Sequence, residues 1–257
     1  MLFRVKADGT LLLAYSFNSA LGSEPNGVIE VSDGNFYGTT LIGGANDQGI
    51  VFQYTSSGTL NDLHDFCGTS GCADGANPGA ALVQGTDGNF YGTTNELGTG
   101  TICPTEGALC GTIFKITSTG GFNSLYNFCS LPGCTDGGVP LAQLVQSTDG
   151  AFYGTTSEGG STSCSFGCGT VFRLSVGLAS FVQSTPAFGK VGYTIFILGN
   201  NLTGTSSVTF NGVAAEFTVV SGSYIKATVP SGATTGTISV VTPSGTLNSK
   251  GAFQVLP

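Results

Sequence analysis

The sequence has no tryptophan, one methionine and few charged residues, and these shortages exclude several classes of partner. Charged residues make up 9% of the 257 positions, against about 25% in an average soluble domain. The net charge is −8, and the seven basic residues form no cluster. Because nucleic acids and anionic membranes are bound by clustered Lys and Arg, the composition argues against both nucleic acid and membrane surfaces as partners.

Catalytic groups are also scarce. The only histidine, His64, lies in the phrase Leu-His-Asp-Phe, whose equivalents elsewhere in the chain carry Tyr15 and Tyr126 at the same place. A position that accepts both His and Tyr is typical of packing or of the surface. No phosphate-binding loop, nucleophile elbow or zinc-protease motif occurs. We therefore expect no catalytic residue, no metal and no cofactor.

Long hydrophobic runs are missing as well. No stretch approaches the roughly 20 apolar residues of a membrane-spanning helix. Residues 1–13 do not form a secretory signal, because Arg4, Lys6 and Asp8 interrupt the apolar stretch. Eight cysteines nevertheless indicate an oxidising compartment. We expect a fragment or mature piece of an exported, extracellular or cell-surface protein, with the export route and any anchor left open.

What the chain does contain is a repeated octapeptide, Asp-Gly-Asn-Phe-Tyr-Gly-Thr-Thr. It occurs at residues 33–40 and 87–94, and with Ala in place of Asn at 149–156, at intervals of 54 and 62 residues. Three further apolar runs recur with it: one carries Phe3, Phe52, Phe114 and Phe172, a second ends at Phe17, Phe66 and Phe128 after a Gly turn, and a third precedes the Asp-Gly turn. Short strands joined by Asp-Gly and Gly turns predict antiparallel β-hairpins.

These runs predict an all-β fold of three four-stranded, propeller-like units at about 2–40, 50–94 and 112–156, with an extra strand at 170–174. Propellers close with roughly four to eight blades, so three units predict an incomplete ring or an open stack. Whether the ring closes within one chain, by association of chains or with further N-terminal blades stays open. Open strand edges favour pairing with another chain.

After Ser175 the residue composition and the spacing of turns change, which divides the chain into a repeat domain at 1–177 and a second domain at 178–257. The second part has no cysteine and no octapeptide. We expect strands at Tyr193–Leu198, Val208–Phe210, Tyr224–Val229, Thr237–Val241 and Phe253–Leu256. Six or seven strands in about 80 residues suggest a small immunoglobulin-like β-sandwich.

The cysteines lie only in lengthened connectors. The connector from the second-strand Phe to the Asp-Gly turn is 16 residues without cysteine in the first unit and 21 with one pair in the next two. The connector from that turn to the next Phe grows from 19 to 27 and 23, again with one pair each. This pattern predicts local disulfides, with zinc ligands or free thiols as the alternatives. The pairs are Cys67 with Cys72, Cys103 with Cys110, Cys129 with Cys134, and Cys164 with Cys168.

In a four-stranded up-and-down unit both long connectors emerge at one end, and insertions gathered on one face often mark a binding surface. There we place weak candidate ligand residues: Glu96 and Glu158, which follow the octapeptide, and Tyr91 and Tyr153 within it. Without a ligand-binding role, the two glutamates would be solvated loop residues and the two tyrosines would pack between repeats. Asp33, Asp87 and Asp149 could suggest calcium, but Asp-Gly turn chemistry accounts for them.

The Phe-Tyr-Gly-Thr-Thr phrases, with the following Gly-Thr-Ile-Phe-Lys-Ile and Gly-Thr-Val-Phe-Arg-Leu, resemble the Gloeo/Verruco tandem repeat of bacterial surface and secreted proteins over residues 1–175. Residues 179–257 resemble an IPT/TIG immunoglobulin-like domain, carried by Gly192–Leu202, Val208–Gly212 and Ala227–Pro230. The first resemblance implies a propeller-type protein without assigned activity. The second implies a spacer or interaction module.

The sequence thus favours a non-catalytic extracellular or cell-surface structural and adhesion module. Its expected partners are itself, in an oligomer or fibre formed through unclosed repeat edges, or other surface proteins. A carbohydrate-binding accessory module that uses the long-loop face for polysaccharide is the alternative. A glycan-active enzyme that uses Glu96 and Glu158 is the least favoured hypothesis.

Overall fold

The structure is a computed structural model, and it describes residues 1–99, 110–161, 163–164 and 166–257. The chain divides into two compact units: Met1–Val145 with Phe152–Leu174, and Gln146–Ala151 with Ser175–Pro257. Both are built of β-strands, and the described residues contain no α-helix. No helix in the described part is long and apolar enough to cross a membrane. The predicted all-β fold is confirmed.

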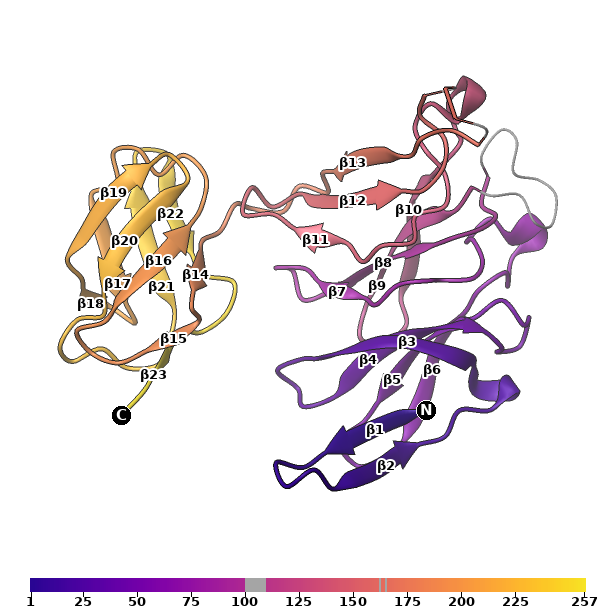
Figure 1. Cartoon of the computed structure of the whole chain (residues 1–257), viewed down its shortest axis with the longest axis horizontal. Coiled ribbons are helices and arrows are strands. Elements are labelled where there is room, and N and C mark those ends of the chain that lie inside the picture. Colours follow the sequence, from indigo (N-terminus) through magenta and orange to yellow (C-terminus); the bar gives the residue numbers. More distant parts are fainter. Residues whose placement is uncertain (100–109, 162, 165) are drawn as a thin grey trace. The chain divides into compact units, whose positions relative to one another are not determined.

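The first unit contains a hairpin and three antiparallel sheets (Figure 1). The hairpin pairs β1 (Leu2–Val5) with β2 (Leu11–Tyr15). Sheet A is β3 (Ser23–Glu30), β4 (Phe36–Ile42), β5 (Ile50–Tyr54) and β6 (Leu60–Asp65), paired in that order. Sheet B is β7 (Val83–Gln84), β8 (Phe90–Thr94), β9 (Thr112–Ile116) and β10 (Phe122–Asn127). Sheet C is β11 (Val145–Gln146), β12 (Phe152–Thr156) and β13 (Thr170–Leu174).

The sheets group the strands differently from the units expected from sequence. The predicted units 2–40, 50–94 and 112–156 each begin with the strand that carries Phe3, Phe52 or Phe114. In the structure each sheet begins two strands later, so that the octapeptide strand is second in its sheet and the Phe strand third. The expected unit limits are corrected by two strands. The physical reason is that the four runs recur in cyclic order, so the sequence does not show which run begins a sheet, and only the pairing of β4 with β5 and of β8 with β9 decides it.

The octapeptide forms a turn and the second strand of each sheet, and its Asp and Tyr are bonded to each other. Tyr37 donates from its hydroxyl to Asp33 Oδ2 at 2.9 Å, and Tyr91 donates to Asp87 Oδ2 at 2.9 Å. The same aspartates accept from backbone N–H groups two residues later. This is the side-chain-to-backbone turn that Asp favours, and it supports turn chemistry for the Asp-Gly pairs.

The sheets stack through the same octapeptide. Tyr37 of sheet A stacks on Phe90 of sheet B with ring centroids 4.2 Å apart, and Tyr91 of sheet B lies 4.1 Å from Phe152 of sheet C. Thr39 donates to the carbonyl of Ala80 at 2.8 Å. One repeat therefore holds the next by an aromatic contact and a hydrogen bond.

Glycine at the sixth place of the octapeptide makes room for the third strand. A Cβ on Gly92 would lie 2.5 Å from Cζ of Phe114 and 2.9 Å from Cδ2 of Leu82. Both of those side chains are buried in the core between sheets A and B. Glycine here serves close packing, since the backbone at this position needs no positive φ.

The second unit is an immunoglobulin-like sandwich. One sheet orders β14 (Gln183–Thr185), β16 (Thr194–Leu198), β20 (Tyr224–Thr228) and β19 (Phe217–Ser221). The other orders β18 (Val213–Ala214), β17 (Ser207–Phe210), β21 (Ile238–Thr242) and β22 (Gly245–Asn248). β15 (Phe188–Gly189) and β23 (Gln254–Val255) form a parallel pair.

A single buried cluster fills this sandwich, with Ile195, Ile197, Val208, Phe210 and Ile238 among its members. Alternate residues of β16, Ile195 and Ile197, point into it while their neighbours are exposed. This is the period-2 pattern of a half-buried strand. All five strands expected from the sequence of this part are present.

Candidate functional site: the long-loop end of the repeat domain

The long connectors of the repeat domain gather at one end of its sheets. We call the described residues of connectors 43–49, 66–82, 95–111, 128–144 and 157–169 the long-loop end. Figure 1 shows the connectors and their short 3₁₀ turns at the end opposite the tight turns that join β1 to β2, β3 to β4, and β7 to β8. The long connectors thus emerge at one end of the sheets, as the up-and-down order of the strands predicts.

Backbone bridges tie the two kinds of connector together. Ala76 and Glu96 exchange N–H···O bonds of 2.9 and 3.2 Å, and Gly138 and Glu158 exchange bonds of 3.0 and 3.1 Å. The N–H of Gly98 also donates to the carbonyl of Cys72 at 3.1 Å. Each between-sheet connector is thus fastened to the within-sheet connector that follows it.

Disulfides staple the between-sheet connectors. Cys67 is joined to Cys72 and Cys129 to Cys134, each closing a loop of the same length. The two loops share one conformation: all four cysteines have a positive φ between 50° and 59°. Few non-glycine residues adopt that region, and in each loop the cross-link joins two residues that do.

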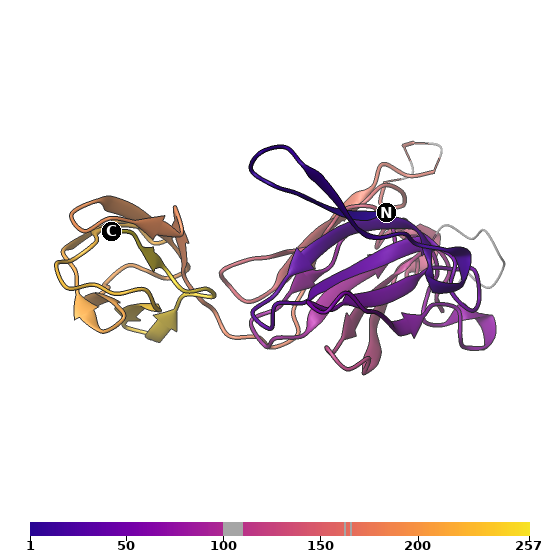
Figure 2. The same ribbon diagram turned by 90° about the horizontal axis from the view of Figure 1, so that it is seen from below.

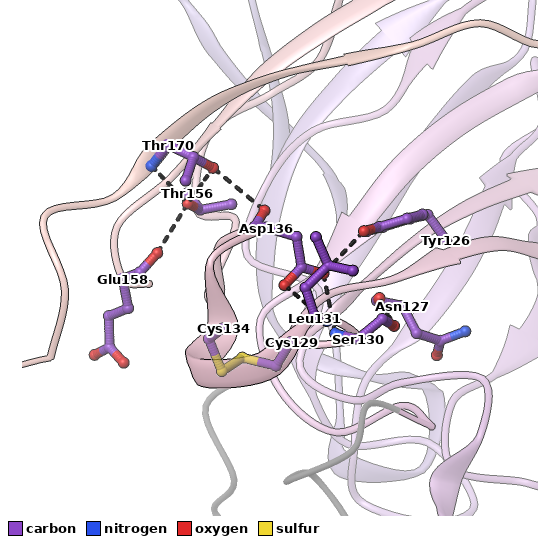
Figure 3. Close-up of a disulfide and its surroundings, with 10 residues drawn as sticks. All are labelled: Tyr126, Asn127, Cys129, Ser130, Leu131, Cys134, Asp136, Thr156, Glu158 and Thr170. Atoms are coloured by element: carbon purple, nitrogen blue, oxygen red, sulfur yellow. Dashed lines mark hydrogen bonds between the residues drawn. A yellow bond between two sulfur atoms is a disulfide. The ribbon is translucent and has the colours of Figure 1, made fainter. Parts of the chain in front are cut away.

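Figure 3 shows how Asp136 organises the second stapled loop from inside. Its carboxylate accepts from the Tyr126 hydroxyl at 2.8 Å and from the backbone N–H groups of Ser130 and Leu131 at 2.9 and 3.3 Å. Burial, and the hydrogen bond to a negative group, raise the pKa of Tyr126 to about 12. Asp136 therefore acts as an anchor of the loop.

In the first stapled loop His64 and Asp74 take the places of Tyr126 and Asp136. His64 Nε2 lies 3.0 Å from Asp74 Oδ2, and Thr69 donates to Asp74 Oδ1 at 2.9 Å. Burial acts to raise the pKa of Asp74, but these hydrogen bonds outweigh it and the pKa lies below its ordinary value. The imidazole stacks on Phe122 with centroids 3.8 Å apart. The packing role expected for His64 agrees with this position.

The other two cysteine pairs lie in the within-sheet connectors. Cys164 is joined to Cys168 in the connector between β12 and β13. Cys103, the predicted partner of Cys110, lies outside the described residues. Cys110 itself is buried, together with Cys129, in a small cluster. Three of the four predicted pairings are thus disulfides in the structure. No group of three metal-ligating side chains gathers in the described part of the chain.

The structure brings Glu96 and Glu158 to the long-loop end and removes Tyr91 from it. Both glutamates use their backbone in the bridges described above, and the Glu158 carboxylate points away from the stapled loop (Figure 3). Tyr91 is fully buried between sheets B and C, and burial and its bond to Asp87 raise its pKa well above the ordinary value. The prediction of Tyr91 as an accessible ligand contact is wrong, because sheet C covers it. Tyr153 is half-buried and accepts from Arg173 Nε at 3.1 Å.

Two cross-linked loops at this end carry exposed apolar side chains that were not singled out from sequence. Leu131 in the second stapled loop is 50% exposed, and Phe166 beside Cys164 is 74% exposed. The C-x₄-C and C-x₃-C spacings would have marked both, since each lies within a cross-linked loop. A cross-linked loop loses less conformational entropy on binding than a free loop does, so exposed apolar groups on it are suited to contact with a ligand.

This architecture defines a class: a tandem-repeat β-protein of propeller type with an immunoglobulin-like domain. The family model described as the Gloeobacter/Verrucomicrobia repeat matches residues 1–216, and the IPT/TIG domain model matches residues 180–255. The chain belongs to the Gloeobacter/Verrucomicrobia repeat family and carries a TIG domain. Both predicted resemblances are confirmed.

Comparison with individual proteins adds little. A search of curated proteins finds no match to this sequence. Among solved structures the chain is similar to the X-ray structure of a candidate gluconolactonase, with 15% identity and a TM-score of 0.36. The match covers 87% of this chain and 64% of that one. A likeness at this level carries no argument about activity. Disulfides and a TIG domain are consistent with an extracellular protein.

Proposed function

We propose that this protein is a non-catalytic extracellular or cell-surface structural and adhesion module that associates with itself or with other surface proteins. The observation that carries the proposal is the use of the octapeptide. Its Asp and Tyr bond to each other, its Phe and Tyr stack between sheets, and its glycine makes room for packing. The most repeated chemistry of the chain is thus directed at holding repeats together.

The absence of catalysis is part of the proposal. Glu96 and Glu158 serve the connectors through their backbone, and His64 is held between Asp74 and the ring of Phe122. A panel of polysaccharides incubated with the protein should yield no reducing ends. Hydrolysis by the natural protein that disappears in Glu96→Gln/Glu158→Gln would refute the proposal and favour a glycan-active enzyme.

Adhesion is tested directly with protein-coated beads. Beads that carry the oxidised protein should cluster, and beads that carry protein reduced and alkylated at its cysteines should not. The cross-links from which export is expected are tested in the same samples by thiol counting, which should find no free thiol before reduction. Beads that stay dispersed at every coating density would contradict adhesion between surfaces.

A second candidate function is carbohydrate binding at the long-loop end. The observation that favours it is the pair of exposed apolar side chains, Leu131 and Phe166, on cross-linked loops. An exposed aromatic ring is a suitable platform for a sugar face. On a polysaccharide array Phe166→Ala should abolish binding, whereas Phe188→Ala, which removes a 51% exposed ring from the TIG domain, should leave it unchanged. Equal loss in both variants would rule this candidate out.

A further inference from the structure

One face of sheet C is exposed although the same face of sheets A and B is covered. Val171 is 78% exposed, while the equivalent Val51 of sheet A and Ile113 of sheet B are 0% and 2% exposed. Thr155 is exposed, while Thr39 and Thr93 are buried. We call the face that carries Thr155 and Val171 the back face of sheet C.

Sheets A and B show what covers a back face of this kind. Behind sheet A, Val51 packs in one cluster with Phe90, Leu82 and Phe114 of sheet B. Behind sheet B, Thr93 donates to the carbonyl of Pro140 at 3.2 Å. In both cases the cover is the front of the next repeat: its octapeptide Phe, its third-strand Phe and the connector before its first strand.

Sheet C also has one strand fewer than its neighbours. In sheets A and B the third strand pairs on its outer side with β6 or β10. In the described part of the chain β13 pairs only with β12. A fourth strand could therefore pair with the outer edge of β13, in the position that β6 has in sheet A and β10 has in sheet B.

The opposite end of the repeat domain has the complementary arrangement. Hairpin β1–β2 packs on the face of sheet A that is turned away from sheet B, which we call its front. It lies there as the third and fourth strands of a further repeat would. The ring centroids of Phe17, just after β2, and Phe52 lie 5.0 Å apart. The same contact recurs between the later repeats, with centroid distances of 5.2 Å for Phe66 and Phe114 and 5.0 Å for Phe128 and Phe172. Figure 2 shows the turn of this indigo hairpin standing clear of the sheets.

A cleft of about 610 Å³ lies where the first and second strands of that further repeat would be. Phe36 and Val28 of sheet A line it on one side, and Leu2 and Phe3 of β1 on the other. Phe36 is only half-buried. Its equivalents Phe90 and Phe152 are fully buried under the octapeptide Tyr of the preceding sheet. The cleft thus has the position of an octapeptide strand.

β1 and β13 are the same strand of the repeat. Leu2-Phe3-Arg4-Val5 and Val171-Phe172-Arg173-Leu174 share the Phe-Arg pair and have aliphatic residues on both sides. β1 pairs with a fourth strand, β2, but no second strand pairs with it among the described residues. β13 pairs with a second strand, β12, and with no fourth strand in the part of the chain that the structure describes. Each strand has the neighbour that the other lacks.

We propose that two copies of this chain exchange these strands. Sheet C of one copy enters the cleft before sheet A of the other, β13 takes the place of β1, and β2 of that second copy becomes the fourth strand of sheet C. Tyr153 then lies over Phe36, and Val171 is covered as Val51 and Ile113 are. This inference rests on the proposed self-association and names the segments that perform it.

The exchange closes with two copies. The ladder between β2 and β1 is replaced by one between β2 and β13, so the number of strand pairs is unchanged, and the back face of sheet C is covered in addition. Two copies contribute three sheets each. The resulting six lie within the roughly four to eight blades of closed propellers, whereas three or nine do not. The product is a closed dimer with two identical joints.

The first test is the mass of the oxidised full chain by sedimentation equilibrium over a range of concentrations. We expect twice the 25.9 kDa of one chain. Val171→Asp should weaken association by about 100-fold or more, because the joint would bury an unpaired carboxylate. This side chain is exposed in the single chain, so the variant should fold. The control is Val220→Asp, which changes a 52% exposed valine of the TIG domain and should not alter association.

A second variant should change the association in the opposite direction. Phe3 is 56% exposed and lines the cleft, so Phe3→Ser should loosen β1 and lower the Kd of the dimer. A mixture of Arg173→Cys and Leu12→Cys chains should form a covalent heterodimer, because Arg4, which Arg173 replaces, is the register partner of Leu12. Mass spectrometry of the linked peptides would identify the joint.

The outcomes separate the two proposals. A monomer at every concentration would overturn both the exchange and self-association. A dimer that Val171→Asp leaves unchanged, or assemblies larger than a dimer, would overturn the closed exchange and leave self-association standing. A dimer that Val171→Asp dissociates, Val220→Asp preserves and Phe3→Ser tightens would establish the exchange.

Discussion

The stapled loops allow a prediction whose magnitude follows from loop closure. Cys129→Ser/Cys134→Ser opens a cross-link that spans a sequence separation of 5. By the chain-entropy relation such a loop contributes about 2 kcal/mol to the free energy of unfolding, because the cross-link restricts the unfolded chain. Cys67→Ser/Cys72→Ser opens a loop of equal length and should lose the same amount. The two losses should add when the variants are combined.

Urea unfolding followed by tyrosine fluorescence measures this loss, since six of the eight tyrosines lie in residues 1–177. With a slope of about 2 kcal/mol per M, each double variant should lower the midpoint by about 1 M. The N–H of Gly160, which donates to the Cys134 carbonyl at 2.9 Å, should exchange faster in the first variant.

The two staples differ in burial, and this difference provides the refutation. Cys129 is 1% exposed, whereas Cys67 and Cys72 are half-buried. If the stabilisation came from packing of the sulfur atoms, the Cys129 variant would lose more. A difference above about 1 kcal/mol between the two variants would therefore refute the loop-closure argument.

Three further predictions concern the core and the pH dependence. Gly92→Ala should destabilise the repeat domain by about 1–3 kcal/mol in thermal unfolding, because its methyl group would meet the buried ring of Phe114. Asp74, bonded to His64, has a lowered pKa in the folded protein, so it contributes stability at pH values above its ordinary pKa near 4. That stability is lost as pH falls through the pKa of the folded state. In Asp74→Asn the free energy of unfolding should therefore fall less steeply with decreasing pH. The Tyr126 hydroxyl should titrate by ultraviolet absorbance near its pKa of about 12, and the stability that its raised pKa reflects should decline only as pH rises toward that value.

Local features of the fold were predictable from sequence, and pairing between distant strands was not. The octapeptide strands, their Asp-Gly turns and the cysteine pairs depend on residues within a few positions of each other. The grouping of strands into sheets does not. Since four runs recur in cyclic order, any run can begin the unit. The hydrogen bonds between β8, which carries Gly92, and β9, which carries Phe114, decide the matter, and they join strands on either side of connector 95–111.

The candidate site shows the same division. Glu96 and Glu158 were placed at the correct end because strand parity is a local count. Tyr91 and Tyr153 occupy the same place in the octapeptide, yet one is fully buried and the other half-buried. Their difference comes from the presence of a following sheet behind Tyr91. Exposure of a repeated residue depends on its position in the stack, which the repeat itself does not encode.

The pairing of Tyr37 with Phe90, and of Tyr91 with Phe152, has a consequence for how such chains grow. Each octapeptide carries both halves of the contact, since its Phe faces the repeat before it and its Tyr the repeat after it. Duplication of one gene segment of this length therefore supplies a complete new joint at once, with no compensating substitution. The connectors meanwhile diverge at one end, where length and cross-linking can change without disturbing the contact. Evolution can lengthen the array and diversify its surface independently.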